Sequence, residues 1–106
     1  MIGVRILSES KPNMMDLHGI IEKEFFGTKS LAALIWLIDM GRELEFEFNG
    51  TIYFISRYAD AKKYVSLWQD KSEQSFDSVS ELIVNATIEN HPFLFVWNEA
   101  KIQTLF

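Results

Sequence analysis

The chain of 106 residues contains no cysteine, which excludes a disulfide, a thiolate nucleophile and a cysteine-ligated metal site. Small secreted domains usually depend on such cross-links, and we therefore expect a cytoplasmic location. Proline occurs twice and glycine five times, and neither a flexible linker nor an internal repeat divides the sequence. A chain of this length without a linker predicts one domain over residues 1–106.

Long apolar runs and basic clusters are also missing. The longest apolar run, LAALIWLI at Leu31–Ile38, is far shorter than the roughly 20 residues that span a bilayer. The N-terminus, MIGVRILSESKP, lacks the apolar core of a signal peptide. The formal net charge is -5, and Glu43–Phe106 holds ten acidic and five basic residues. Because such a surface repels phosphates, we expect binding to neither nucleic acid nor membranes.

Recognisable catalytic and cofactor motifs are absent. The sequence has no phosphate-binding glycine loop and no nucleophile elbow around its serines. His18 and His91 are the two histidines, and neither has a partner at metal-ligand spacing. Glu43, Glu45 and Glu47 would project about 7 Å apart from one strand face, where carboxylates can share acid/base work or bind a cation. We favour a solvated strand face and predict no catalytic residue, cofactor or metal.

The composition supports a folded domain, with 48% hydrophobic and 24% charged residues. Nine Phe and three Trp are more aromatic side chains than a small interior readily holds.

Alternation at Ile2–Ile6 predicts a short strand. Two helices should follow. The first should have a cap at Asn13, an apolar side with Leu17, Ile20, Ile21 and Phe25, and a break at Gly27. The second should have a cap at Thr28 or Ser30 and end at Asp39, with Gly41 behind it in the left-handed conformation.

The stretch GRELEFEFNGTIYFISR, Gly41–Arg57, predicts a hairpin, since Asn49-Gly50 favours a two-residue type I′ turn. In that register the facing pairs are Phe48–Thr51, Phe46–Tyr53 and Leu44–Ile55 on one face, and Glu47–Ile52 and Glu45–Phe54 on the other. A type I turn with a glycine bulge would instead set Phe46 against Ile52 and Leu44 against Phe54. We favour the first register.

The remaining segments complete an α+β fold. Lys62–Gln69 alternates as a third strand of an antiparallel meander, and Ser78 with Glu81 forms a capping box at the head of a short helix. FLFVW, Phe93–Trp97, suits either a helix that Pro92 begins or a buried strand, and we favour the helix. The prediction is two N-terminal helices, a three-stranded antiparallel meander, a short capped helix and a C-terminal helical segment packed on the sheet.

Two of these segments carry a resemblance. LIDMGRELEFEFNGTIYFIS and FDSVSELIVNATIENHPFLFVW resemble small uncharacterised cytoplasmic proteins of Gram-positive bacteria, a family of unknown function, over Leu31–Trp97. The resemblance implies the fold described above and no activity that can be assigned to particular residues. Some small acidic proteins of this kind act as immunity proteins beside toxins.

The hairpin also carries the candidate site. Ile52 and Phe54 share a predicted sheet face with Glu45 and Glu47. Either helices cover both faces of the sheet, or this face is an apolar patch with acidic neighbours, as in many protein-binding sites. We predict a non-enzymatic protein-binding domain, an immunity or regulatory factor, whose partner is another protein or a second copy. The alternative is a small-molecule-binding or enzymatic domain with its site between helix and sheet.

Overall fold

The computed structural model describes residues 14–58 and 64–106, and the predicted strand Ile2–Ile6 and cap Asn13 lie outside them. Within these residues four helices accompany a five-stranded antiparallel sheet, which confirms the α+β class. The elements are α2 (Met14–Thr28), α3 (Leu31–Asp39), β1 (Leu44–Phe48), β2 (Thr51–Arg57), β3 (Val65–Gln69), β4 (Ser72–Phe76), α4 (Val79–Asn85), β5 (Thr87–Ile88), β6 (His91–Pro92), α5 (Phe93–Glu99) and β7 (Lys101–Leu105).

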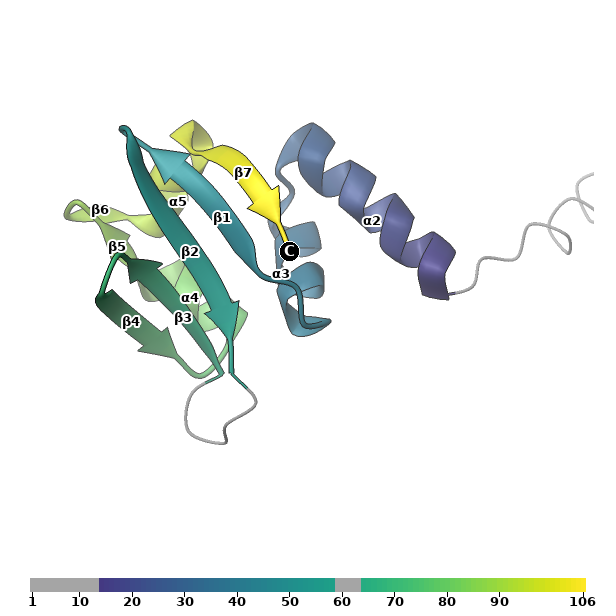
Figure 1. Ribbon diagram of the computed structural model, residues 1–106, viewed down its shortest axis with the longest axis horizontal. Coiled ribbons are helices and arrows are strands. Elements are labelled where there is room, and N and C mark those ends of the chain that lie inside the picture. The colour runs from purple at the N-terminus through teal and green to yellow at the C-terminus, as the bar shows by residue number, and fades with distance from the viewer. Residues whose placement is uncertain (1–13, 59–63) are drawn as a thin grey trace, which may run out of the picture.

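The sheet has the strand order β4-β3-β2-β1-β7 (Figure 1). The predicted meander forms its three central strands, although the part of the third strand before Tyr64 lies outside the described residues. Strands β4 and β7 extend the sheet at its two edges and were not predicted. The C-terminal segment is therefore a helix followed by an edge strand, and β5 and β6 form a separate two-stranded hairpin.

The β1–β2 hairpin has the predicted type I′ register, with Phe46 opposite Tyr53 and Glu45 opposite Phe54. Asn49 and Gly50 both have positive φ, 53° and 80°, as this turn requires. The alternative register with a glycine bulge is wrong. Because side chains alternate between the faces of a strand, this register also decides which side chains reach the core.

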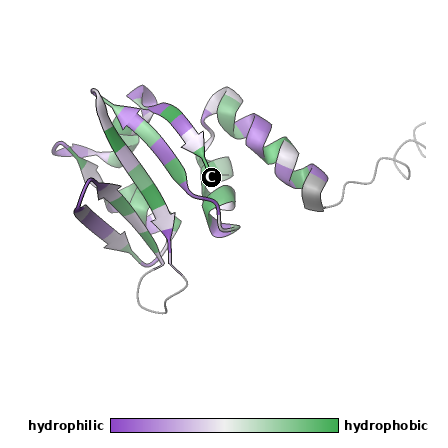
Figure 2. Cartoon of the chain, in the orientation of Figure 1, coloured by the Kyte–Doolittle hydropathy of each residue, from purple (hydrophilic) through white to green (hydrophobic). Residues whose placement is uncertain are grey.

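One face of the sheet carries the hydrophobic core. Helices α3, α4 and α5 lie behind the sheet in the view of Figure 1, and hydrophobic and hydrophilic residues alternate along β1 and β2 in Figure 2. The core joins the inward residues of the strands with the apolar sides of these helices, and its largest fully buried side chains include Phe25, Leu34, Leu37, Ile38, Leu44, Phe46, Tyr53, Ile55, Leu67, Leu82 and Phe93.

Local signals at the helix ends largely correspond to the structure. The Ser30 hydroxyl accepts from the Ala33 amide and caps α3, and Gly41 follows with φ of 99°. The Ser78 hydroxyl accepts from the Glu81 amide, which confirms the predicted cap of α4. Phe93–Glu99 is a helix with Pro92 at its N-cap, so the buried-strand interpretation is wrong.

Helix α2 differs most from its prediction. It continues through Gly27 to Thr28, and Leu17 and Ile20, expected on its buried side, are 38% and 58% exposed. The reason is that α2 packs mainly on α3 and extends away from the sheet (Figure 1). Only a narrow stripe of the α2 surface, which includes Phe25, is therefore buried.

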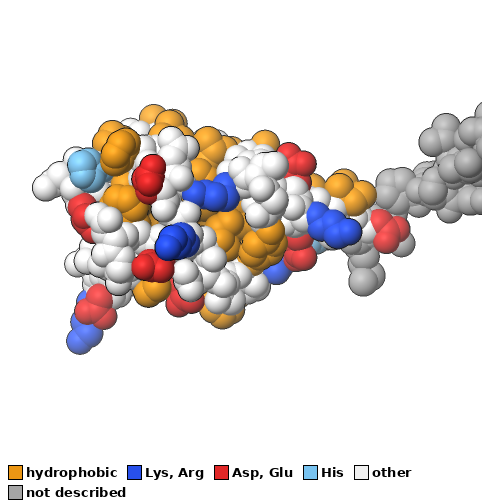
Figure 3. All heavy atoms as spheres, turned by 90° about the horizontal axis from the view of Figure 1, so that it is seen from above, with side chains coloured by type: hydrophobic (Ala, Val, Ile, Leu, Met, Phe, Trp, Pro, Cys, Tyr) orange, Lys and Arg blue, Asp and Glu red, His pale blue; other side chains and the backbone are white. Residues whose placement is uncertain are grey.

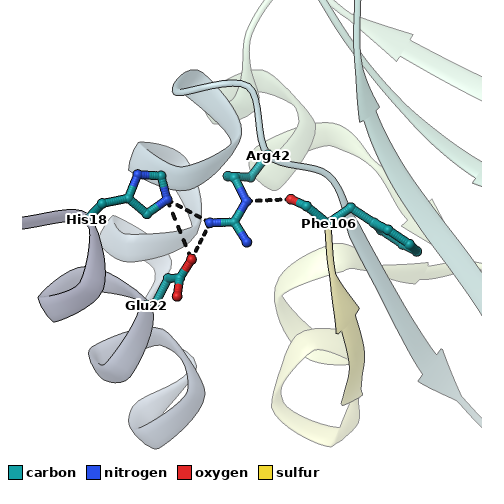
Figure 4. A network of polar contacts seen from close by, with 4 residues as sticks. All are labelled: His18, Glu22, Arg42 and Phe106. Carbon is teal, nitrogen blue, oxygen red and sulfur yellow. Dashed lines mark hydrogen bonds and ion pairs between the residues drawn. The ribbon is translucent and has the colours of Figure 1, made fainter. Parts of the chain in front are cut away.

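A polar network fastens α2 to the chain around it (Figure 4). Arg42 donates from Nη1 to Glu22, lies 2.6 Å from His18 Nε2 by the same nitrogen, and donates from Nε to the backbone oxygen of Phe106. The His18 ring meets Trp36 edge-on, with centroids 5.1 Å apart, so His18 belongs to the α2–α3 contact.

Candidate interaction surface on the open face of the sheet

The face of the sheet opposite α3, α4 and α5 is here called the open face. No helix among the described residues lies in front of it in Figure 1. The expectation that helices cover both faces is therefore wrong for the described part of the chain. Strand register and alternation assign to the open face the side chains Glu45, Glu47, Ile52, Phe54, Ser56, Ser66, Trp68, Glu73, Ser75 and Thr104.

Four of these residues form one row across the strands. Glu45 faces Phe54, Phe54 faces Trp68, and Trp68 faces Glu73 in successive strand pairs. This cross-strand row, Glu45–Phe54–Trp68–Glu73, has an aromatic pair at its centre and a carboxylate at each end. Since neighbouring strands lie about 4.8 Å apart, the backbones at its two ends are about 14 Å apart.

Apolar side chains remain accessible around the centre of the row. Ile52 is 46% exposed, and Phe106 is 57% exposed with its ring 5.8 Å from the ring of Phe54. A shallow depression of about 590 Å³ lies beside the aromatic pair, lined by Thr51, Ile52, Phe54, Trp68, Gln69 and Asp70. Figure 3 shows the molecule from above, at right angles to the view of Figure 1, and there hydrophobic side chains lie at the surface beside acidic and basic ones.

Glu73, at one end of the row, is held by three hydroxyl groups. Its Oε2 accepts from Ser66 at 2.6 Å, from Ser75 at 3.0 Å and from Tyr58 at 3.1 Å. Burial, together with the adjacent Glu73 carboxylate, raises the pKa of Tyr58 above its usual range, so the phenol remains a neutral donor near pH 7. These donors orient the carboxylate.

The other polar groups of the face are held by neutral donors. Thr104 Oγ1 donates to Glu45 Oε1, and Gln103 Nε2 to Glu47 Oε1, each at 3.4 Å. The indole nitrogen of Trp68 donates to Ser56 Oγ at 3.0 Å, which orients the ring. The open face therefore presents oriented carboxylates and aromatic rings, a set of groups that can bind apolar and cationic side chains.

A second depression lies between α5 and the sheet, near the β1–β2 turn. Its volume is about 580 Å³ and its lining is Glu47, Phe48, Asn49, Gly50, His91, Phe95, Glu99 and Lys101. The His91 and Phe95 rings are 5.1 Å apart and form one wall. Among the side chains that the structure describes, no group of three or more His, Asp or Glu is arranged to hold a metal ion.

The structure brings the predicted residues Glu45, Glu47, Ile52 and Phe54 together on one exposed face. Trp68 and Glu73 were missed as members of the same surface. Alternation in KKYVSLWQ indicates that Trp68 lies on one face of its strand. The register of β3 on β2, which sets Trp68 beside Phe54, could not be predicted because no turn signal comparable to Asn49-Gly50 joins these two strands.

Residues 14–58 and 64–106 contain no helix with the length and apolar content needed to cross a bilayer. Comparison of the whole chain with models of protein families, with curated proteins and with solved structures found no match.

Proposed function

We propose that this chain is a non-enzymatic protein-binding domain of the cytoplasm and that its open face binds a different protein with an apolar centre and a basic rim. The cross-strand row is the observation that carries the proposal, because it sets two half-buried aromatic rings between two oriented carboxylates. Isolated exposed apolar residues need no explanation, whereas a continuous apolar patch with polar edges is typical of an interface.

The apolar and acidic groups would act differently in binding. Burial of Ile52, Phe54 and Trp68 supplies affinity, at about 25 cal/mol for each Å² of apolar surface removed from water. Glu45 and Glu47 lie at the edge of this patch, where charges set orientation and association rate more than net affinity. This division accounts for glutamates directly opposite Ile52 and Phe54 in the hairpin.

Charge favours a different protein over a second copy. The net charge of the chain is -5, and two open faces packed together would oppose the carboxylates of Glu45, Glu47 and Glu73. Like charges facing each other are unfavourable at an interface. An immunity or regulatory factor would use such a surface to recognise a basic partner.

The test uses the immobilised full chain to capture partners from a lysate at low and high salt, beside three variants. Phe54→Ser removes an apolar group of the open face, Glu45→Gln removes a charge there, and Val84→Ser is a matched control, since Val84 is 70% exposed on α4. The captured protein is identified and purified, and its affinity for each variant is measured.

We expect Phe54→Ser to weaken the affinity by about tenfold or more, as for a central interface residue. Glu45→Gln should mainly lower the association rate and its salt dependence, and Val84→Ser should bind like the unmodified chain. Equal binding of the Phe54→Ser and Val84→Ser variants would contradict the proposed surface. Dimerisation of the isolated chain through this face would contradict the choice of partner.

A small-molecule site is the second candidate function, and the depression between α5 and the sheet favours it. That depression brings His91, Glu99 and Lys101 to one opening. A metabolite that binds there raises the melting temperature of the chain through linkage, and Lys101→Met or His91→Ala should remove the increase. Stabilisation that both variants retain would rule out this depression as the site.

A further inference from the structure

We propose that the depression on the open face receives an arginine side chain of the partner protein, whose guanidinium group stacks on Trp68 and pairs with Asp70. This inference rests on the proposed function and specifies one residue of the partner. It follows from the lining of the depression, where Ile52, Phe54 and Trp68 supply apolar surface and Asp70 supplies a carboxylate.

The apolar part of the depression comes from two neighbouring strands. Phe54 of β2 and Trp68 of β3 face each other directly, and Ile52 lies two residues before Phe54 on the same side of β2. The indole nitrogen, the one polar atom of the Trp68 side chain, donates to Ser56 at 3.0 Å. Trp68 therefore presents ring carbon to the depression, and this hydrogen bond orients the ring before a partner arrives.

Asp70 brings a negative charge to one rim of this apolar surface. Gln69 pairs with Ser72, so Asp70 lies in the two-residue turn that joins β3 to β4. Its Cα is two residues beyond that of Trp68, a separation of about 6 to 7 Å along a strand. Asp70 is exposed, and Lys71, the other residue of the turn, does not line the depression. A cation that lies over the indole ring is therefore within reach of this carboxylate.

The charges around the depression also favour a cation. On the side away from Asp70, Glu45 and Glu47 project from β1 onto the same face of the sheet. Lys101 faces Glu47 from β7 and offsets part of this charge. The surroundings of the apolar surface remain acidic, and their field attracts a cationic group and repels an anionic one.

Arginine suits this depression better than lysine does. A guanidinium group is planar and weakly hydrated, so it stacks on an aromatic ring and still donates in its own plane to a carboxylate. An ammonium group is a compact, strongly hydrated charge without a flat face. The methylene stem of the arginine would lie on Ile52 and Phe54. Its guanidinium group would then lie on Trp68 with one edge toward Asp70.

The experiment titrates the ¹⁵N-labelled full chain with blocked amino acids at low salt and follows amide and indole signals by NMR. The probe is N-acetyl-arginine methylamide. The matched ligands are the same derivatives of citrulline, which has nearly the shape of arginine without its charge, and of lysine. We expect the probe to shift the Trp68 indole signal and the Asp70 amide signal. It should bind about three- to tenfold more tightly than the citrulline derivative, with the lysine derivative between them.

Two variants locate the contacts. Asp70→Asn removes the charge at the rim and Trp68→Leu removes the aromatic ring, and each should weaken binding of the probe by about two- to fivefold. Asp70→Asn should leave the affinity for the citrulline derivative unchanged. Asp77→Asn is the matched control, since Asp77 is exposed and follows the opposite end of β4 from Asp70. Melting temperatures verify that all three variants remain folded.

The outcomes separate this inference from the proposed function. Equal binding of the arginine and citrulline derivatives overturns the cation site, and equal binding of the arginine and lysine derivatives overturns the preference for a guanidinium group. Unshifted signals at Trp68 and Asp70, or equal binding of the probe by Asp70→Asn and Asp77→Asn, also contradict the inference. In each of these cases the capture assay with Phe54→Ser decides the proposed function by itself.

Discussion

Lys29 and Trp97 hold the α2–α3 connection against α5 through two contacts. The indole nitrogen of Trp97 donates to the backbone oxygen of Lys29 at 3.0 Å, and the Lys29 ammonium lies 5.3 Å from the Trp97 ring centroid. The same ammonium donates to the Ala100 carbonyl at 2.6 Å. Residues 68 apart in sequence therefore join the N-terminal helices to the last turn of α5.

Replacement of this ammonium should destabilise the fold. Lys29→Met keeps an apolar stem but removes the charge over Trp97 and the donor to Ala100, and we expect the free energy of unfolding to fall by about 1 to 2 kcal/mol. Urea unfolding measures the change. A double-mutant cycle with Trp97→Phe should give a coupling energy of about 0.5 to 1 kcal/mol. Additive effects would show that the cation and ring contribute independently.

Two glycines should respond oppositely to the same substitution. Gly50 has φ of 80° in the β1–β2 turn, so Gly50→Ala should cost about 1 to 2 kcal/mol of stability. Gly19 lies inside α2 with open space where a Cβ would be, and Gly19→Ala should add about 0.5 to 1 kcal/mol. Thermal or urea unfolding of both variants tests this, and a stabilising Gly50→Ala would contradict the type I′ turn.

Arg42 should control the attachment of α2. Arg42→Met removes the hydrogen bonds to Glu22, His18 and the Phe106 backbone. We expect the free energy of unfolding to fall by about 1 to 2 kcal/mol. Amide hydrogen exchange should accelerate in α2 more than in β1 and β2, because the sheet core is untouched. Lys23→Met, at an exposed position of α2, is the control. Identical exchange in the two variants would show that the network does not hold α2.

Stability should fall in alkaline solution partly because of Tyr53. Burial, aided by the nearby Glu89 carboxylate, raises the pKa of Tyr53 in the folded state. Its contribution is therefore complete below the unfolded pKa of about 10 and is lost as pH rises through the higher folded pKa. Tyr53→Phe removes this pH-dependent contribution to stability. The unfolding free energy of the variant should therefore fall less than that of the unmodified chain between about pH 9 and pH 11. Lys29, Tyr58 and Tyr64 titrate in both proteins, so their effects on the unfolding free energy cancel in the comparison. Parallel pH profiles would contradict the assignment.

Part of the candidate site could be predicted from local sequence. Asn49-Gly50 and the period-two alternation around it determine which residues face each other in the hairpin, and that register places Glu45, Glu47, Ile52 and Phe54 on one face. These signals act within a few residues, through allowed backbone angles and the side-chain alternation of a strand. The caps at Ser30 and Ser78 are local for the same reason.

The sequence by itself thus determined the α+β class, the turn, the hairpin register and the helix caps. The tertiary structure decided what lies beside the hairpin. Ser72–Phe76 (SEQSF) and Lys101–Leu105 (KIQTL) have little apolar alternation, and they become edge strands because β3 and β1 offer open backbone hydrogen-bonding edges. Because α3, α4 and α5 pack on one face, no helix among the described residues covers the row from Glu45 to Glu73. Strand pairing and helix packing depend on distant segments, which no short window of sequence contains.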